Sequence, residues 1–121
     1  MPNCPPTYRL RFFFDYQSGG CLWSDNEAAY QQFDTGPLDA AIYDQQGNLR
    51  QKPKIELPDF IRQKVLKLDH LYAESLDWEN PGGPSLWDNA QWDNFYAQTS
   101  SLHQEITVFL GADFEVIYQQ V

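Results

Sequence analysis

Two segments of the chain carry apolar residues at the spacing of long amphipathic helices, and this feature constrains the fold most. The first stripe, between Pro58 and Leu76, comprises Ile61, Val65, Leu68, Tyr72 and Leu76, with Leu71 at its edge. The second stripe, between Asp88 and Leu110, comprises Trp92, Phe95, Tyr96, Thr99, Leu102, Ile106 and Leu110. Pro58 suits a first helical position, Asp88 suits an N-cap and Gly111 suits the helix end. Both stripes need an apolar surface to cover them.

Strand patterns before and after the two helices can supply that surface. The stretch "TYRLRFFFDY" alternates, with Tyr8, Leu10, Phe12 and Phe14 on one face and Arg9, Arg11, Phe13 and Asp15 on the other. The stretch "DFEVIY" also alternates, with Phe114, Val116 and Tyr118 on one face. The short "CLW" segment can pair with a strand over a few residues. These segments predict a sheet with one apolar face.

Shorter signals lie between these strands and the first long helix. Ser24 followed by Glu27 predicts a capping box for a short helix that runs toward Phe33. "AIYDQQGNLRQ" predicts a hairpin, because Asp44 can open the turn and Gly47 can take the left-handed position that closes it.

Together these elements predict the α+β class, with an antiparallel helical hairpin packed on one face of a small, mainly antiparallel sheet. The place of the last strand in the sheet is left open. We expect one domain over residues 1–121, with residues 1–6 as a flexible tail.

Charge is distributed unevenly along the chain. The net charge is −9, and residues 68–121 contain nine acids without one Lys or Arg, whereas residues 1–67 are balanced. A protein that binds nucleic acid needs clustered Lys and Arg for the phosphates, and residues 68–121 have none. Nucleic acid is therefore a poor partner for this surface, and a basic protein is a better one. The alternative is that the charge only keeps the protein soluble. No secretory leader or apolar run of membrane-spanning length appears, so we expect a cytoplasmic protein with no membrane partner.

The stretch "DWENPGGPSLWD" connects the two helices and has three interpretations. It partly overlays a calcium-binding loop, but Pro81 stands where an oxygen ligand is needed, so we expect no calcium site. It can simply turn the chain, with Trp78 and Trp87 covering the end of the helical pair. It can also form an aromatic and acidic recognition patch. The candidate binding residues of that patch are Asp77, Trp78, Glu79, Trp87, Asp88 and Asp93.

Catalytic and metal signals are weak. His103 faces the apolar stripe and is expected to be a hydrogen-bonded structural residue, whereas His70 lies on the opposite side of its helix and should be solvated. Cys4 and Cys21 are expected to be free thiols, and these cysteines and histidines lack the close pairs of a zinc site. We assign no catalytic residue, metal or cofactor.

Two apolar residues, Leu66 and Val108, fall on the polar sides of their helices. They can be scattered apolar surface, or they can mark a homodimer contact.

The segments "RLRFFFDY", "CLW", "LDWENPGGPSLW" and "LGADFEVI" resemble those of a group of small uncharacterised bacterial proteins. The resemblance covers the two ends and the helical hairpin, and the central "AIYDQQGNLRQKPK" is an extra piece of this chain. The resemblance implies a bacterial, cytoplasmic, single-domain protein and assigns no activity or catalytic residue. From the residues, the first hypothesis is a non-enzymatic acidic module that binds a basic partner, similar to an immunity protein or antitoxin. The alternative is a small ligand-binding or enzymatic domain with a pocket near His103.

Overall fold

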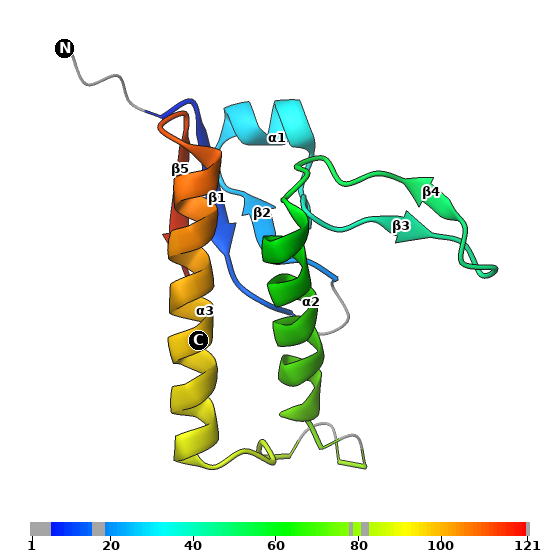
Figure 1. The fold of residues 1–121 in the computed structure, drawn as a ribbon, viewed down its shortest axis with the longest axis vertical. Helices are drawn as coiled ribbons and strands as arrows, with labels where there is room; N and C mark the ends of the chain where they lie inside the picture. The colour runs from blue at the N-terminus through cyan, green and yellow to red at the C-terminus, as the bar shows by residue number, and fades with distance from the viewer. Residues whose placement is uncertain (1–5, 16–18, 78, 81–82, 121) are drawn as a thin grey trace.

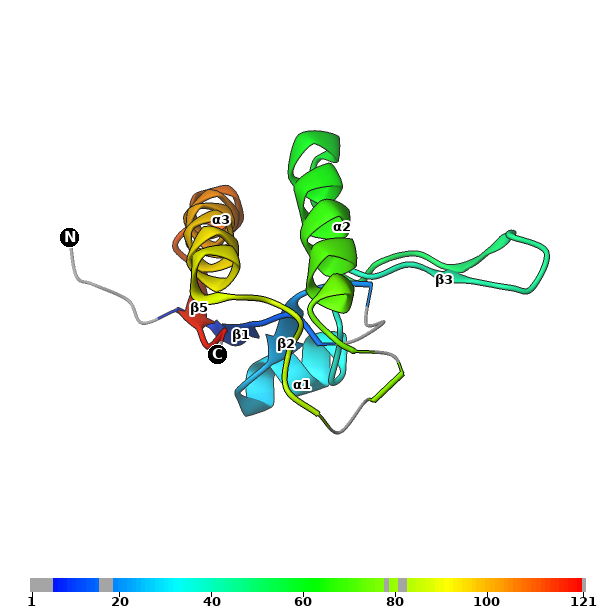
Figure 2. The same cartoon turned by 90° about the horizontal axis from the view of Figure 1, so that it is seen from below.

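Two long helices lie side by side on the same side of a three-stranded sheet (Figures 1 and 2). This computed structural model describes residues 6–15, 19–77, 79–80 and 83–120. The strands are β1 (Tyr8–Phe12), β2 (Leu22–Ser24), β3 (Ile42–Tyr43), β4 (Leu49–Gln51) and β5 (Phe114–Tyr118). The helices are α1 (Glu27–Phe33), α2 (Asp59–Glu74) and α3 (Asn89–Leu110). The predicted α+β class and the helical hairpin, α2 followed by the antiparallel α3, are confirmed.

The three-stranded sheet is mixed rather than mainly antiparallel as predicted, with the order β2-β1-β5. Strand β1 pairs antiparallel with β2, where Arg11 lies opposite Trp23. It pairs parallel with β5, where Tyr8 lies opposite Phe114 and Phe12 opposite Tyr118. The last strand, whose place the sequence left open, therefore lies beside the first. A parallel pair needs a long crossover, which the helical hairpin supplies here.

The core lies between the inner face of the sheet and the apolar stripes of α2 and α3. The buried residues shared by these elements are Leu10, Phe12, Val116, Ile61, Val65, Leu68, Phe95, Leu102 and Ile106. The predicted alternation in β1 is confirmed, because Leu10 and Phe12 are fully buried while Arg9 is exposed. Short helix α1 lies at the end of the sheet, where the Phe33 ring packs 5.0 Å from the Tyr8 ring.

Two helix starts differ from the sequence-based prediction. Ser24 does not cap α1, because the β1–β2 pairing continues through Ser24, whose buried hydroxyl donates to the carbonyl of Asp34. Asn26 caps α1 instead, and its Oδ1 accepts a hydrogen bond from the amide of Ala29 at 2.9 Å. Pro58 occupies the cap position of α2 rather than the first helical position. The start of α3 agrees with prediction, since Asp88 is its N-cap and Gly111 its C-cap.

The predicted hairpin is confirmed and projects away from the rest of the molecule (Figures 1 and 2). Asp44 Oδ1 accepts hydrogen bonds from the amides of Gln46 at 2.9 Å and Asn48 at 2.8 Å, which fixes the turn. Gly47 has φ 84°, the left-handed conformation that favours glycine. We call residues 42–54, the hairpin and the three residues after it, the arm.

Candidate partner-binding end of the helical hairpin

The helical hairpin has carboxylates concentrated at the end where α2 stops and α3 begins. We call this region the acidic end, and its carboxylates are Glu74, Asp77, Glu79, Asp88 and Asp93. All but the half-buried Asp77 are exposed. The ion pairs among the described residues join other groups: Arg9 and Arg11 to Asp25, Arg62 to Asp39, and Lys64 to Glu105. The negative charge of the acidic end is therefore not neutralised within the described part of the chain.

Two of these carboxylates also hold the local backbone. Asp77 Oδ1 accepts a hydrogen bond from the amide of Glu79 at 3.0 Å. Asp88 forms a capping box with Gln91: Asp88 Oδ1 accepts from the Gln91 amide at 2.8 Å, and Gln91 Oε1 accepts from the Asp88 amide at 2.9 Å. Each of these two carboxylates therefore orders the backbone next to it. Within the described residues, the side chains of Glu74, Glu79 and Asp93 accept no backbone hydrogen bond, and all three are exposed.

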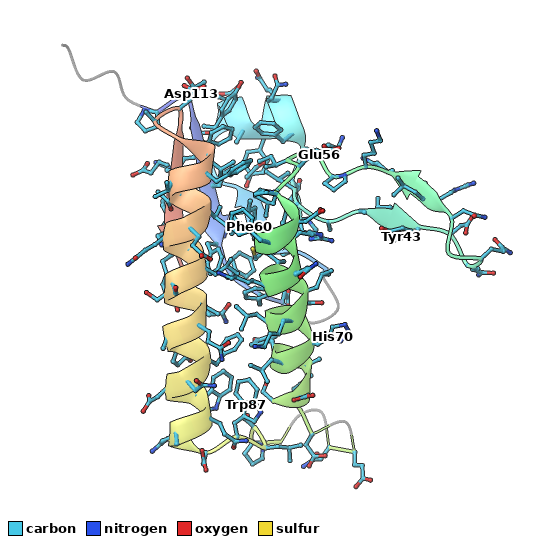
Figure 3. All side chains as sticks on the ribbon, in the orientation of Figure 1. Tyr43, Glu56, Phe60, His70, Trp87 and Asp113 are labelled. Atoms are coloured by element: carbon cyan, nitrogen blue, oxygen red, sulfur yellow. The ribbon has the colours of Figure 1, made fainter. Side chains whose placement is uncertain are left out.

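The described tryptophans of this region complete the core. The half-buried Trp87 ring lies 4.8 Å from the Trp92 ring and 5.4 Å from the ring of Phe95, and Figure 3 shows Trp87 at the end of the helical pair. This agrees with the interpretation in which Trp87 covers the end of the helices. Trp78 lies outside the described residues, as do Pro81 and Gly82 of the suspected calcium loop. Leu86 is 61% exposed beside Trp87 and offers apolar surface that the sequence analysis did not single out.

The predicted binding residues in the described chain thus lie at one end of one helical hairpin. The sequence analysis missed Glu74 as a member of this group. Glu74 could have been predicted from the sequence, because it lies at the expected end of the first long helix and inside the stretch without Lys or Arg. In the described residues no group of three or more His, Cys, Asp or Glu side chains is arranged to hold a metal ion.

His103 lies between α3 and the sheet. Its Nε2 is 2.6 Å from the carbonyl oxygen of Val116, and its ring packs 5.6 Å from the rings of Phe12 and Tyr118. These contacts join α3 to β1 and β5. His103 is therefore packed against aromatic side chains, and its Nε2 is hydrogen-bonded to the Val116 carbonyl of β5.

We expect the substitution His103→Gln to lower the free energy of unfolding by about 1 to 3 kcal/mol, because the bond to Val116 is lost or lengthened. Urea denaturation followed by circular dichroism measures this change. His70→Gln is the matched control, since His70 is exposed and its replacement should change stability by less than about 0.5 kcal/mol. Equal midpoints for wild type and His103→Gln would contradict the structural role.

A buried carboxylate that the sequence analysis did not predict joins β2 to α2. Asp39 is fully buried, and its Oδ1 accepts hydrogen bonds from the amides of Cys21 at 2.9 Å and Leu22 at 3.0 Å. Arg62 Nη1 lies 3.8 Å from Asp39 Oδ2. Burial raises the pKa of Asp39, and the backbone amides and Arg62 partly oppose that rise. A Cβ on Gly20 would lie 2.5 Å from Asp39 Oδ1, so the carboxylate requires glycine there.

Cys21 is a free, buried thiol in contact with this carboxylate, which agrees with its prediction as a free thiol. Burial, followed by the nearby charge of Asp39, raises the pKa of the Cys21 thiol well above its ordinary value. The thiol is therefore kept protonated, and its Sγ lies 3.6 Å from Asp39 Oδ2. Cys4 lies outside the described residues.

A hollow of about 510 Å³ lies between the start of α2 and the end of α3. Its lining includes Phe60, Val108 and Phe109, and Val108 is 82% exposed, as its position on the polar side of the helix predicted. His103 does not line this hollow. Among the described helices, none has the length and apolar content needed to cross a membrane.

The described residues define a small α+β protein in which a helical hairpin covers a mixed sheet. A family model described as "Serratia CdiI immunity protein-like" matches residues 9–121. The match extends over most of the chain, so this protein belongs to that family. The resemblance to small bacterial proteins is thereby confirmed. A comparison with curated proteins gave no match.

Proposed function

We propose that this chain is a non-enzymatic immunity protein that binds a partner toxin and blocks its action in the cytoplasm. The observation that carries the proposal is the match of residues 9–121 to an immunity protein-like family. An immunity protein needs a surface that recognises one partner protein, and it needs no catalytic residues of its own. The task is then to locate that surface.

We assign the toxin-binding surface to the acidic end. Its exposed carboxylates include Glu74, Glu79 and Asp93, and no ion pair among the described residues offsets them. A negative surface of this kind steers a basic partner toward it and orients the partner on approach. Leu86 and the exposed part of Trp87 supply apolar area beside the charges. The toxin that fits this surface has Lys and Arg grouped around an apolar contact.

The alternative, a ligand pocket near His103, has less support. The space around the His103 ring is occupied by Phe12 and Tyr118, and its Nε2 contacts the backbone of Val116. A general base needs free access to its substrate. The packing of His103 therefore favours the binding protein over the enzyme.

The test takes candidate toxins from the genes that neighbour this chain's own gene and measures the dissociation constant by calorimetry at two salt concentrations. One variant combines Glu74→Gln, Asp77→Asn, Glu79→Gln and Asp93→Asn. Asparagine at position 77 retains a side-chain oxygen that can accept the amide hydrogen of Glu79, so the local turn is preserved. We expect affinity to fall about 10- to 100-fold, mostly through slower association, with a weaker salt dependence than in wild type.

A matched control neutralises four exposed acids elsewhere: Glu27→Gln, Glu56→Gln, Asp59→Asn and Glu115→Gln. It changes the net charge by the same amount and should retain most of the affinity. Equal losses in both variants would show that only net charge matters and would remove the assignment to the acidic end. Absence of binding between wild type and the toxin would overturn the immunity proposal itself.

A further inference from the structure

The arm leaves apolar side chains uncovered. Ile42, Tyr43 and Leu49 are 52%, 61% and 50% exposed, and the arm extends to the side of α2, away from the sheet and helices (Figures 1 and 2). Among the described residues, β3 and β4 pair only with each other. A two-stranded hairpin without a packing surface is marginally stable in water. The arm therefore needs another surface to cover it.

The arm is also basic. Arg50 lies on β4, and Lys52 and Lys54 lie on the segment that returns from β4 to α2; with Asp44 as the acid of residues 42–54, the arm has a net charge of 3 − 1 = +2. None of the three bases has an ion pair among the described residues. The surface that covers the arm should accordingly be acidic, with some exposed apolar area. The acidic end of this same chain has both properties, in its carboxylates and in Leu86. The molecule is thus complementary to a second copy of itself.

Helix α2 separates these two surfaces by its own length. Lys52 and Lys54 shortly precede its first residue, and Glu74 is its last residue. Sixteen residues at 1.5 Å per residue make the helix about 24 Å long. If two copies of α2 pack antiparallel, the start of each helix lies beside the end of the other. Each arm is then brought to the partner's acidic end.

One side of α2 is suited to this packing. Figure 3 shows His70 pointing to the side on which the arm projects. Leu66 and Glu74 lie one helical turn before and after His70, so they share its side of the helix. Leu66 is 39% exposed, although it is apolar. This side therefore has an apolar residue near the middle of the helix and a carboxylate at its end.

We infer that the chain forms a two-fold homodimer in which α2 packs antiparallel on α2 of a second copy, and each basic arm lies on the partner's acidic end. The two-fold axis passes between the two copies of α2, near the middle of each helix, where Leu66 lies. Such a contact is closed and self-complementary, so it makes dimers rather than fibres. Ile42, Tyr43 and Leu49 become covered, and Arg50, Lys52 and Lys54 gain carboxylate partners.

The homodimer goes beyond the proposed function: the partner's arm occupies the acidic end that we assign to the toxin, so the toxin and the second copy compete for this surface. The dimer itself is measured without any toxin. Sedimentation velocity over a concentration series at low salt gives the dimer dissociation constant. We expect wild type to dimerise, and we expect Lys52→Glu with Lys54→Glu to weaken dimerisation at least tenfold. Glu74→Lys with Glu79→Lys should weaken it equally, because the same contact is disrupted from its other side. Glu27→Lys with Glu115→Lys changes the charge by as much at distant exposed positions and should leave the dimer intact.

Mixing the two charge-reversed variants provides the decisive measurement. In the mixed dimer, the acidic arm of the first variant faces the lysines introduced at positions 74 and 79 of the second. The unchanged basic arm of the second faces the unchanged acidic end of the first. We therefore expect a heterodimer, although each variant alone is monomeric. Circular dichroism and thermal melting confirm that each variant is folded. A wild type that stays monomeric at all concentrations, or variants that dimerise as wild type does, would overturn the inference. So would a mixture that stays monomeric. Toxin binding by a monomeric wild type would leave the proposed function standing.

Discussion

Asp39→Ala should lower the free energy of unfolding at neutral pH by about 3 to 5 kcal/mol, the usual effect of removing one partner from a buried charged contact. The substitution leaves the amides of Cys21 and Leu22 without their acceptor, and it leaves Arg62 without its carboxylate. It also opens a small cavity beneath Gly20, which packs against the carboxylate. Urea denaturation of wild type and variant measures the difference. The exposed Asp93→Ala is the control and should change stability by less than about 0.5 kcal/mol.

The same pair of proteins tests the direction of the pKa shift. Burial raises the pKa of Asp39 in the folded state, so the folded protein holds this proton more tightly than the unfolded chain does. The stabilisation by that proton is complete below the unfolded pKa, near 4, and is lost as pH rises through the folded pKa. Asp39→Ala should remove this fall in stability with pH. A variant with wild-type stability at neutral pH, or with an unchanged pH slope, would contradict the role given to Asp39.

Phe95→Ala should cost about 3 to 5 kcal/mol, as replacement of a fully buried phenylalanine by alanine does in well-packed cores. The Phe95 ring is completely buried and lies 5.6 Å from the ring of Tyr72 and 6.1 Å from that of Phe14. It therefore connects both helices to the end of the first strand, and its removal leaves a cavity shared by three parts of the structure. We expect a proportional shift of the thermal midpoint.

Phe109→Ala is the matched control on the same helix, because its ring is about half exposed and little packing is lost. It should cost less than about 1 kcal/mol. Trp87 also contacts Phe95, so fluorescence reports the local change independently of the global midpoint. Similar losses for the two phenylalanines would show that the core is not centred where the structure places it.

The elements predicted well from the sequence are those in which apolar residues recur at the spacing of one buried face. The stripes of α2 and α3 and the alternation of β1 each describe one element facing one core, so each can be interpreted without its neighbours. The parallel pairing of β5 beside β1 could not be obtained this way, because it depends on how the helical hairpin crosses the sheet. Ser24 shows the same limit on a smaller scale, since strand pairing with Leu10 takes priority over a local capping pattern.

The candidate site shows a similar division. The absence of Lys and Arg after position 67 identified the acidic region from the sequence alone. It could not show that Asp77 and Asp88 also order the backbone, or that Trp87 packs against the core. Asp39 gave no signal, because its partners are backbone amides that carry no sequence pattern. The related feature in the sequence is Gly20. The need for glycine at that position is apparent only from the structure, in which the Asp39 carboxylate lies against it.

The parallel pairing of β1 with β5 also sets an order of events during synthesis. Strand β1 emerges from the ribosome before the helices do, yet the backbone partner of Tyr8 is Phe114, more than one hundred residues later in the chain. Pairings between residues so far apart form slowly, since a long loop must close first. Until the residues of β5 have emerged, β1 has no neighbour on that edge and the apolar row of the sheet is incomplete. A newly made copy can therefore complete its sheet only after translation has passed β5, however early its acidic end was made.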